Sequence, residues 1–406
     1  MGLRAVFVGD GSLLIRCVDI FSRSGGLAVG IVTSNARVAE WARDEAVPVL
    51  DWPERGTPAL DAFEFDYLFS IANLRLIPKE TLARAKRAAI NFHDSLLPAY
   101  AGLNAPSWAI MADETRHGVT WHEMTTDIDG GRVLRQQSFA ITSEDTAFTL
   151  NARCYEAGAE AFEHLIEDLK HDRFASVAQT GTRSYYGRSD RPRGAATVDL
   201  GRPAAEISAL ARALDFGGYA NPLGLPKLLL GKDVLLARSV GVVASRPSMR
   251  PHSLVSVGED RLVVSCADAD LCLARLTAPD GSSVEQVLRR NGIAVGEELP
   301  ALHGDVVDKV TRYDRRAASF EAWWLREFGR IVPTALPYPH QARGPGHAVE
   351  VQSIRLALAA PAGGGLAIAA GFVGWVTRLT GLATVSLLYR DGELADAVRG
   401  IEAWFP

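Results

Sequence analysis

Residues 91–131 contain the side chains of this sequence that are best suited to chemistry. Asn91 and His93 stand two positions apart in an apolar run, and Asp129 follows later in an Asp-Gly-Gly sequence. Residues two apart on a β-strand point to the same face of the sheet, and an aspartate from a following loop could reach that histidine. An amide donor, an imidazole and a carboxylate can together stabilise an oxyanion and transfer a proton without a metal ion.

Each of these three residues also has a structural interpretation when it is taken alone. A histidine at the end of a strand is often a hydrogen-bonded structural residue, and Asn91 could cap a turn. Asp129 before two glycines is a common turn signal. Asp127 lies two residues before Asp129, so a carboxylate pair that helps to bind the substrate amine is a further interpretation.

The sequence predicts no metal site. His93, His117 and His122, together with Asp94, lack the HExxH or HxH spacing that is typical of zinc ligands. The cysteines are scattered and form no CxxC pair, so zinc and redox motifs have no support. We expect them to be reduced thiols of a cytoplasmic protein; they are Cys17, Cys154, Cys266 and Cys272.

The amino-acid composition indicates the general class of protein. Hydrophobic residues make up 48% and charged residues 22% of 406 residues, which is ordinary for a soluble globular chain of two or three domains. The net charge of −5 favours neither nucleic acid nor an anionic membrane as a partner. The apolar segment 5–8 is too short for a secretory signal. The uncharged segment 356–377 is long enough to span a bilayer, but it is rich in Ala and Gly and contains Pro361, so we expect no membrane span.

Strand-like and helix-like segments alternate in the first half of the chain. This alternation predicts a parallel, doubly wound α/β sheet. The pair Gly9-x-Gly11 is an incomplete dinucleotide fingerprint, because Leu14 stands where a third glycine is needed, so we expect a tight strand-to-helix turn there. The expected strands are 5–8, 27–33, 47–50, 67–71 and 88–92, and the expected helices are 12–21, 36–45, 78–85 and 146–169.

The second half of the chain has a different pattern. The polar segment 180–196, rich in Gly, Ser, Pro and Arg, is typical of a linker, and a helix is expected at 199–214. Short β-rich runs with turns between them then predict a small antiparallel barrel. These runs are 228–230, 234–240, 253–257, 261–265 and 271–277, and residues 287–290 with the turn at Gly296 would close the domain.

An ordered motif connects these observations to a known family. The run Asn-Phe-His-Asp-Ser-Leu-Leu-Pro at 91–98 is followed by Gly118-Val119-Thr120 and then by Asp127-Ile128-Asp129-Gly130. This pattern resembles the formyltransferases that use 10-formyltetrahydrofolate. They include methionyl-tRNA, glycinamide ribonucleotide and amino-sugar formyltransferases, and formylation domains at the start of nonribosomal peptide synthetases.

The resemblance implies a role for each candidate residue. Asn91 would donate a hydrogen bond to the oxyanion, His93 would stabilise that charge or shuttle a proton, and Asp129 would orient His93 and accept a proton. Folate would bind at the carboxyl ends of the strands without a metal. The implied folate-binding residues are Ser70, Ile71, Ala72, Asn73 and Leu74, then Ser95, Leu97 and Pro98 in a turn, and Asp127 in a closing loop.

The resemblance also implies a domain order. Residues 1–185 would form the folate-binding catalytic domain and 197–303 an open, OB-like barrel. Residues 306–406 lie outside the formyltransferase pattern. Residues 320–325 and 336–339 resemble the linker after a formylation domain, and 369–381 resemble a helix of a condensation domain, as part of a short α/β fragment. An unrelated C-terminal appendage is the alternative.

The amine that accepts the formyl group is less well defined. Segment 33–41 lacks the basic insertion by which methionyl-tRNA formyltransferases hold the acceptor stem, which argues against nucleic acid. The tail favours an aminoacyl group, possibly tethered to a carrier protein and acted on before further synthetase domains. An amino sugar is the main alternative, and a catalytically silent docking domain of a megasynthase is another.

Overall fold

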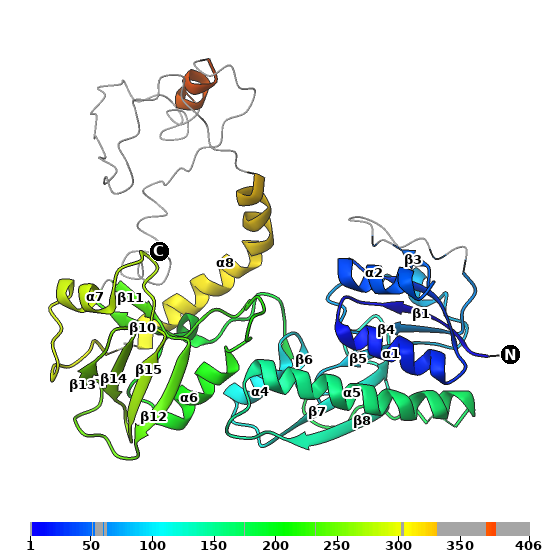
Figure 1. Cartoon of the computed structure of the whole chain (residues 1–406), viewed down its shortest axis with the longest axis horizontal. Helices are drawn as coiled ribbons and strands as arrows, with labels where there is room; N and C mark the ends of the chain where they lie inside the picture. Colours follow the sequence, from blue (N-terminus) through cyan, green and yellow to red (C-terminus); the bar gives the residue numbers. More distant parts are fainter. Residues whose placement is uncertain are drawn as a thin grey trace. The chain divides into compact units, whose positions relative to one another are not determined.

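The computed structural model describes residues 2–50, 52, 60, 63–173, 175–231, 233–301, 304–330 and 371–378. The chain divides into two compact units, Met1–Arg315 and Arg316–Pro406. Figure 1 shows the helices and strands of both units. The predicted domain boundaries at 185, 197 and 303 all fall within the first unit or at its end, and they stay predictions.

A seven-stranded sheet dominates the first unit, in the order β3-β2-β1-β4-β5-β7-β8. Its first five strands are parallel, and β7 runs antiparallel to both β5 and β8. The α/β prediction is confirmed, but the sheet is mixed because β7 and β8 form a hairpin that the sequence analysis did not anticipate. The strands are β1 (Arg4–Val8), β2 (Leu27–Val32), β3 (Val49–Leu50), β4 (Tyr67–Ser70), β5 (Ala88–His93), β7 (Arg116–Glu123) and β8 (Val133–Ala140).

Apolar packing on both faces holds the parallel strands. Phe7 and Phe69 point to one face, where they pack with Phe21 of α1 and Phe162 of α5 at ring-centroid distances of 5.1–5.9 Å. Val6 and Leu68 belong to a separate cluster on the other face. The helices of this layer are α1 (Ser12–Arg23), α2 (Ala36–Asp44), α3 (Lys79–Leu82), α4 (Ala105–Met111) and α5 (Ala147–Lys170). His164 of α5 is exposed.

The turn after β1 is as tight as the sequence indicates. A Cβ atom on Gly9 would lie 1.8 Å from the carbonyl oxygen of Ile71, so only glycine fits between the ends of β1 and β4. The carboxylate of Asp10 then accepts hydrogen bonds from the backbone N–H and hydroxyl of Ser34 and from the hydroxyl of Thr33. These bonds tie together the carboxyl ends of β1 and β2.

Segment 180–196 is more ordered than the linker prediction suggests. Strand β9 (Tyr185–Tyr186) pairs in parallel with β6 (Ala101–Gly102), directly after the motif at 91–98. The ring of Tyr186 stacks on Trp108 and on Tyr100, with interplanar angles of 10° and 9°. A short 3₁₀ turn, η1 (Arg193–Ala196), follows. Aromatic stacking fixes this segment, a contribution that its polar composition hides.

The following strands are antiparallel, as predicted. Four of them form a sheet in the order β12-β15-β14-β13, and β10 and β11 form a separate hairpin. A bridge between Leu236 and Thr277 joins the hairpin to the end of the sheet. The strands are β10 (Lys227–Leu230), β11 (Asp233–Leu236), β12 (Ser239–Ala244), β13 (Leu254–Val257), β14 (Arg261–Ser265) and β15 (Asp270–Ala274), accompanied by α6 (Ala204–Ala213) and α7 (Val284–Arg290). The helix expected at 199–214 begins only at Ala204, because Pro203 caps it.

Helix α8 (Gly304–Arg330) lies within the expected C-terminal linker region. It includes residues 320–325, so that stretch is helical, and its interpretation as a linker stays a prediction. Residues 371–378 are helical, within the helix expected at 369–381, whereas 336–339 lie outside the described residues. No helix in the described part of the chain is long and apolar enough to cross a membrane.

Candidate active site

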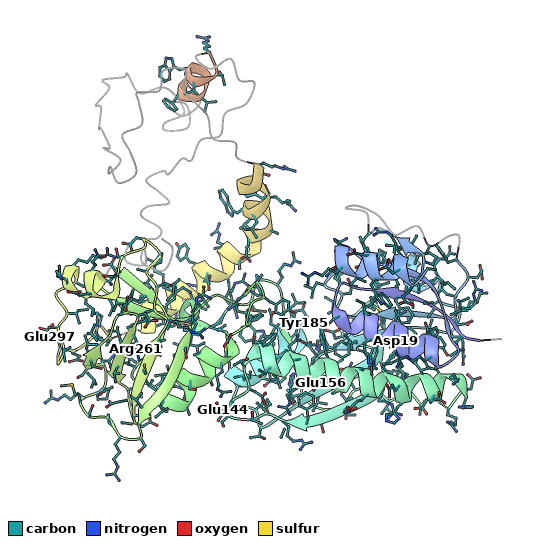
Figure 2. The ribbon with its side chains drawn as sticks, viewed as in Figure 1. Asp19, Glu144, Glu156, Tyr185, Arg261 and Glu297 are labelled. Carbon is teal, nitrogen blue, oxygen red and sulfur yellow. The ribbon has the colours of Figure 1, made fainter. Side chains whose placement is uncertain are left out.

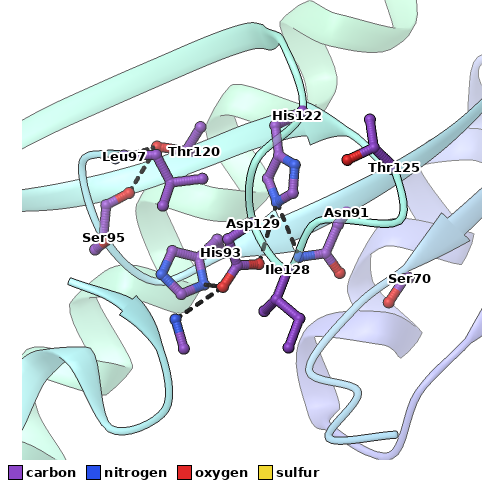
Figure 3. A network of polar contacts seen from close by, with 12 residues as sticks. Ser70, Asn91, His93, Ser95, Leu97, Thr120, His122, Thr125, Ile128 and Asp129 are labelled. Carbon is purple, nitrogen blue, oxygen red and sulfur yellow. Dashed lines mark hydrogen bonds and ion pairs between the residues drawn. The ribbon is translucent and has the colours of Figure 1, made fainter. Parts of the chain in front are cut away.

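The carboxyl end of β5 brings the candidate residues together. Asn91 and His93 lie on this strand, and its antiparallel partner β7 places His122 opposite Asn91 and Thr120 opposite His93. The loop after β7 returns Asp129 to the same place, between the two histidines, as Figure 3 shows. The sequence motif therefore closes into one cluster, as the strand spacing predicted.

The carboxylate of Asp129 is the centre of this cluster. Its Oδ2 accepts a hydrogen bond from the backbone N–H of Gly102 at 2.8 Å and lies 3.6 Å from Nδ1 of His93. Its Oδ1 lies 3.5 Å from Nε2 of His122. Burial acts to raise the pKa of Asp129, but the contact with His122, the charge of His93 and the Gly102 N–H together lower it to about 2. The carboxylate is therefore ionised at neutral pH.

The orientation of His93 is fixed by its other ring nitrogen. Nε2 lies 2.9 Å from the carbonyl oxygen of Tyr100, and since a carbonyl only accepts, Nε2 carries the proton and donates. Nδ1 then faces Asp129, and the carboxylate of Asp94 lies 3.8 Å from the same atom. Two carboxylates therefore surround the nitrogen of His93 that is free to take up a proton.

His122 is a member of the cluster that the sequence analysis considered only as a metal ligand. Its Nδ1 lies 2.8 Å from the carbonyl oxygen of Glu123 and donates to it. In the neutral ring Nε2 is therefore an acceptor, and it donates to the Asp129 carboxylate only when the ring is protonated. The amide nitrogen of Asn91 lies 3.1 Å from that Nε2. The neutral ring thus orients the Asn91 amide and leaves its second N–H free to donate elsewhere. Identification of β7 as a strand would have revealed this pairing.

Gln179 and Arg183, just before and within the predicted linker, hold the Asp129 loop in place. The side-chain amide of Gln179 donates to the carbonyl oxygens of Asp129 and Gly131, at 2.7 and 2.8 Å. Arg183 donates to the carbonyl oxygen of Ile128 at 2.7 Å. Asp129 has a positive φ of 51°, a conformation that Asp and Asn adopt more readily than most residues. No periodic pattern in the sequence predicts these contacts, because they join irregular segments.

The residues expected to bind folate lie at the same edge of the sheet. Ser70 pairs in register with Asn91, and the loop after it exposes the side chain of Leu74 by 73%. Ile71 is fully buried, Ala72 has a positive φ of 49°, and the amide of Asn73 bonds to the backbone of Arg75. Ile71 therefore packs in the core, whereas Leu74 is an exposed apolar side chain at this edge of the sheet.

Hydrogen bonds stabilise the turn that follows β5. The hydroxyl of Ser95 donates to the carbonyl of Ala99, and the backbone N–H of Leu97 donates to the hydroxyl of Thr120. The peptide bond between Leu97 and Pro98 is cis. Asp127 is exposed and its backbone forms a turn with Thr125. Within the described part of the chain, its carboxylate makes no hydrogen bond or ion pair with the Asp129 cluster. The buried side chains of Ser95 and Leu97 shape the turn.

The histidines that were weighed as metal ligands have other partners. His117 is buried against Phe139, with 6.2 Å between their ring centroids. Burial lowers the pKa of His117, although the nearby Asp94 carboxylate opposes that effect. Among the described residues, no group of three or more His, Cys, Asp or Glu side chains is arranged to hold a metal ion.

Comparison with known proteins places this cluster in a family. The profile described as Formyl transferase matches residues 29–166. The methionyl-tRNA formyltransferase of Paraburkholderia phymatum is 31% identical over 255 residues, which cover 61% of this chain and 76% of that protein.

Solved structures show the same fold. The structure of WlaRD, a sugar 3N-formyl transferase solved with dTDP and 5-N-formyl-THF, aligns with a TM-score of 0.55 at 19% identity, over 68% of this chain and 98% of that one. An N-formyltransferase from Helicobacter canadensis, solved with folinic acid and dTDP-3-aminofucose, aligns with a TM-score of 0.54 at 18% identity, over 68% and 100% of the two chains. The profile match and the methionyl-tRNA relative show that the chain belongs to the formyl transferase family and is an enzyme that transfers formyl groups.

Proposed function

We propose that this enzyme transfers the formyl group of 10-formyltetrahydrofolate to a primary amine, and that the acceptor is an aminoacyl group in peptide natural-product synthesis. The observation that carries the proposal is the position of the Asp129 carboxylate, which lies within 3.6 Å of a nitrogen of both His93 and His122. Asn91 completes the set through its contact with His122.

These residues match the charges that develop during formyl transfer. Attack of the amine on the formyl carbon places negative charge on the formyl oxygen and positive charge on the attacking nitrogen, and the bond from that carbon to folate N10 then breaks. The free N–H of Asn91 donates to the oxygen. His93 lies beside the same atoms and stabilises the charge or transfers a proton. An α-amino acceptor, with a pKa of about 8, is partly neutral at pH 7 and can attack.

The Asp129 carboxylate stabilises the positive charge that develops on the attacking nitrogen. A carboxylate with a pKa of about 2 stays ionised, so it attracts the cationic nitrogen as that charge forms. It takes the proton directly or through water, and because it is a weak base it passes the proton on readily. The cluster supplies both oxyanion stabilisation and deprotonation from side chains of this chain alone.

The residues around the Asp129 cluster are suited to bind a folate. A pterin ring is planar and apolar with polar edges, and such ligands bind in concave sites with a few placed polar groups. The exposed side chains of Leu74 and Ile128, which are 73% and 41% accessible, provide apolar surface at the same sheet edge as Asn91. Backbone groups at 70–74 and 95–98 and the loop at Asp127 would supply the polar edges. The two solved formyltransferases that share this fold were crystallised with formylated folates.

The proposal also identifies the class of amine that accepts the formyl group. Segment 33–41 contains a single basic residue, Arg37, so it offers no cluster of cations for the acceptor stem of a tRNA. This supports an aminoacyl acceptor over methionyl-tRNA, although the methionyl-tRNA enzyme is a sequence relative. An amino sugar is the second candidate, since the Helicobacter canadensis enzyme of the same fold was solved with dTDP-3-aminofucose.

We also infer the domain roles. Residues 1–185 would be the folate-binding catalytic domain, and 197–303 an open barrel, which the bridge between β11 and the end of the β15 sheet supports. Residues 306–406 would be a linker and a partial condensation-like fragment of a cytoplasmic synthetase. The first turns of α8 belong to the first unit, where the hydroxyl of Thr311 accepts a hydrogen bond from the backbone N–H of Gly194.

Release of tetrahydrofolate from 10-formyltetrahydrofolate tests the proposal. The acceptor panel contains aminoacyl-pantetheine thioesters, nucleotide-linked amino sugars and methionyl-tRNA. We expect turnover with the aminoacyl thioesters that disappears in His93→Ala and survives in the surface control His164→Ala. Turnover with only an amino sugar would select the second candidate. Failure to bind folate would overturn the donor assignment and leave a silent docking domain.

A further inference from the structure

A cationic cavity lies outside the candidate active site. It has a volume of about 660 Å³ and lies between the η1 segment and the first turns of α8. Four guanidinium groups face two carboxylates around it, so its lining carries an excess of positive charge. The lining residues are Arg191, Arg193, Asp305, Asp308, Thr311, Arg312 and Arg315.

Hydrogen bonds and buried side chains connect the two walls of this cavity. Arg191 is only 7% exposed and donates to the carbonyl oxygens of Arg188 and Asp190. Gly194 takes a positive φ of 62°, and its backbone N–H donates to the hydroxyl of Thr311 on α8. Val310, next along the helix, is fully buried. The two walls are therefore joined by a hydrogen bond and by packing.

The cations on the rim are available to a ligand. Within the part of the chain that the structure describes, the guanidinium of Arg312 has no hydrogen bond and no ion pair. Arg193 pairs with Asp308 at 3.3 Å, but both side chains are about 70% exposed, at 72% and 69%. Exposed pairs of this kind contribute little free energy, so an incoming anion can replace the carboxylate. Arg315 pairs with Asp190 at 3.0 Å and is itself 57% exposed.

The cavity is within reach of the catalytic cluster. Tyr186 of β9 pairs with Gly102, whose backbone N–H holds the Asp129 carboxylate. Arg191 follows Tyr186 by five residues, which span at most about 18 Å even when fully extended. Tyr185 is 49% exposed on the same strand and can be located in Figure 2. A long, flexible acceptor can therefore place its amine at Asp129 and its other end among the arginines.

We propose that this cavity, named here the arginine cavity, binds a phosphate group of the acceptor. Arginine clusters recognise phosphate through paired N–H donors and charge, and a free guanidinium such as that of Arg312 satisfies both requirements. The inference rests on the proposed function, because it assigns the acceptor a phosphate remote from its amine. A carrier-tethered or free aminoacyl-pantetheine phosphate has this chemistry, and so does a nucleotide-linked amino sugar.

Direct binding tests the cavity without any catalysis. Isothermal titration calorimetry of the full chain with 4′-phosphopantetheine and with inorganic pyrophosphate should show binding that weakens as salt increases. We expect Arg312→Gln to weaken it by about tenfold or more, the usual effect of losing a hydrogen bond between charged groups. Arg316→Gln is the matched control, since Arg316 is exposed on the same helix and does not line the cavity.

A substitution that should increase the affinity for phosphate strengthens the test. Asp305 lines the cavity and has no hydrogen bond or ion pair among the described residues, so its carboxylate repels an anion there. Asp305→Asn should therefore tighten phosphate binding several-fold. Equal affinity in wild type, Arg312→Gln and Asp305→Asn, or no measurable binding of either phosphate in the wild type, would overturn the proposal.

Kinetics separates this inference from the proposed function. KM is compared for an aminoacyl-pantetheine thioester with and without its 4′-phosphate, and for a nucleotide-linked amino sugar. We expect the phosphate to lower KM, and this advantage to shrink in Arg312→Gln but not in Arg316→Gln. Turnover that is equal with and without phosphate rejects the arginine cavity and leaves formyl transfer intact. Phosphate binding without folate turnover rejects the proposed function, and the preferred acceptor identifies the source of the phosphate.

Discussion

His122 faces Asn91 directly across the antiparallel pair of β5 and β7, with 3.1 Å between Nε2 and the amide nitrogen. The Glu123 carbonyl accepts from the other ring nitrogen, so a neutral His122 can only accept from Asn91. An asparagine amide has a donor end and an acceptor end of nearly equal shape. His122 therefore decides which end of Asn91 points toward the formyl oxygen.

This relationship predicts a loss of rate when His122 loses its acceptor. His122→Phe keeps a buried ring but removes the acceptor, and should lower kcat by ten- to a hundredfold, about 1–3 kcal/mol for an unsatisfied hydrogen bond. KM for the folate should change little. His122→Gln, which offers an amide oxygen, should recover part of the rate. The exposed His164 is the control, and equal losses in the Phe and Gln variants would contradict an orienting role.

Asn91 itself should matter more for rate than for binding. Loss of one oxyanion donor raises a barrier by about 3 kcal/mol, so Asn91→Ala should reduce kcat by two or more decades. Folate affinity, measured by fluorescence titration, should stay close to that of the wild type because the wall at 70–74 is intact. An Asn91→Ala enzyme with full kcat would remove the amide from the mechanism.

The sequence allowed prediction of the candidate trio but not of the parts that hold it. The two-residue period of a strand places Asn91 and His93 on one face, and the resemblance to formyltransferases adds Asp129 from the following loop. The contacts of Gln179 and Arg183 could not be predicted, since they join two irregular segments that are far apart in the sequence. Similarly, the composition of 180–196 hides the stacking of Tyr186 on Trp108.

Gln179 provides a test of that hidden support. Its amide bridges the carbonyl oxygens of Asp129 and Gly131, so Gln179→Ala should loosen the loop that carries Asp129. We expect kcat to fall several-fold while circular dichroism and the melting temperature change little. Gln137→Ala is the matched control, because among the described residues the side chain of Gln137 bonds to the exposed Glu160 and not to the Asp129 loop. Identical kinetics of the two variants would show that the loop needs no such bridge.

Gly131 should tolerate no side chain. A Cβ atom there would lie 1.7 Å from the carbonyl oxygen of Glu123, in the residue next to His122. Gly131→Ala must push the loop away from β7 and move Asp129 with it, so both stability and kcat should fall. Gly218→Ala has open space around it and serves as the control. The comparison needs thermal unfolding and initial rates, and a fully active Gly131→Ala enzyme would contradict the tight loop geometry.

The ionised Asp129 should also make the free energy of unfolding depend on pH. Its pKa of about 2 in the folded state is below the ordinary value of 3.8, so its contribution is present above pH 4 and is lost as the pH falls toward 2. The contribution is on the order of 2 kcal/mol at neutral pH and is smaller by about 1 kcal/mol at pH 3.

The substitution Asp129→Asn isolates that contribution. Asparagine accepts the positive φ of 51° at this position but does not titrate, so every other acidic group is common to the two proteins. Urea unfolding at pH 6 and pH 3 should show that the wild type loses about 1 kcal/mol more than the variant over this interval. If the two proteins lost equal stability, Asp129 would titrate alike in the folded and unfolded chains. The His93 and His122 contacts would then not stabilise its charge, and the electrostatic core of the proposed mechanism would fail with them.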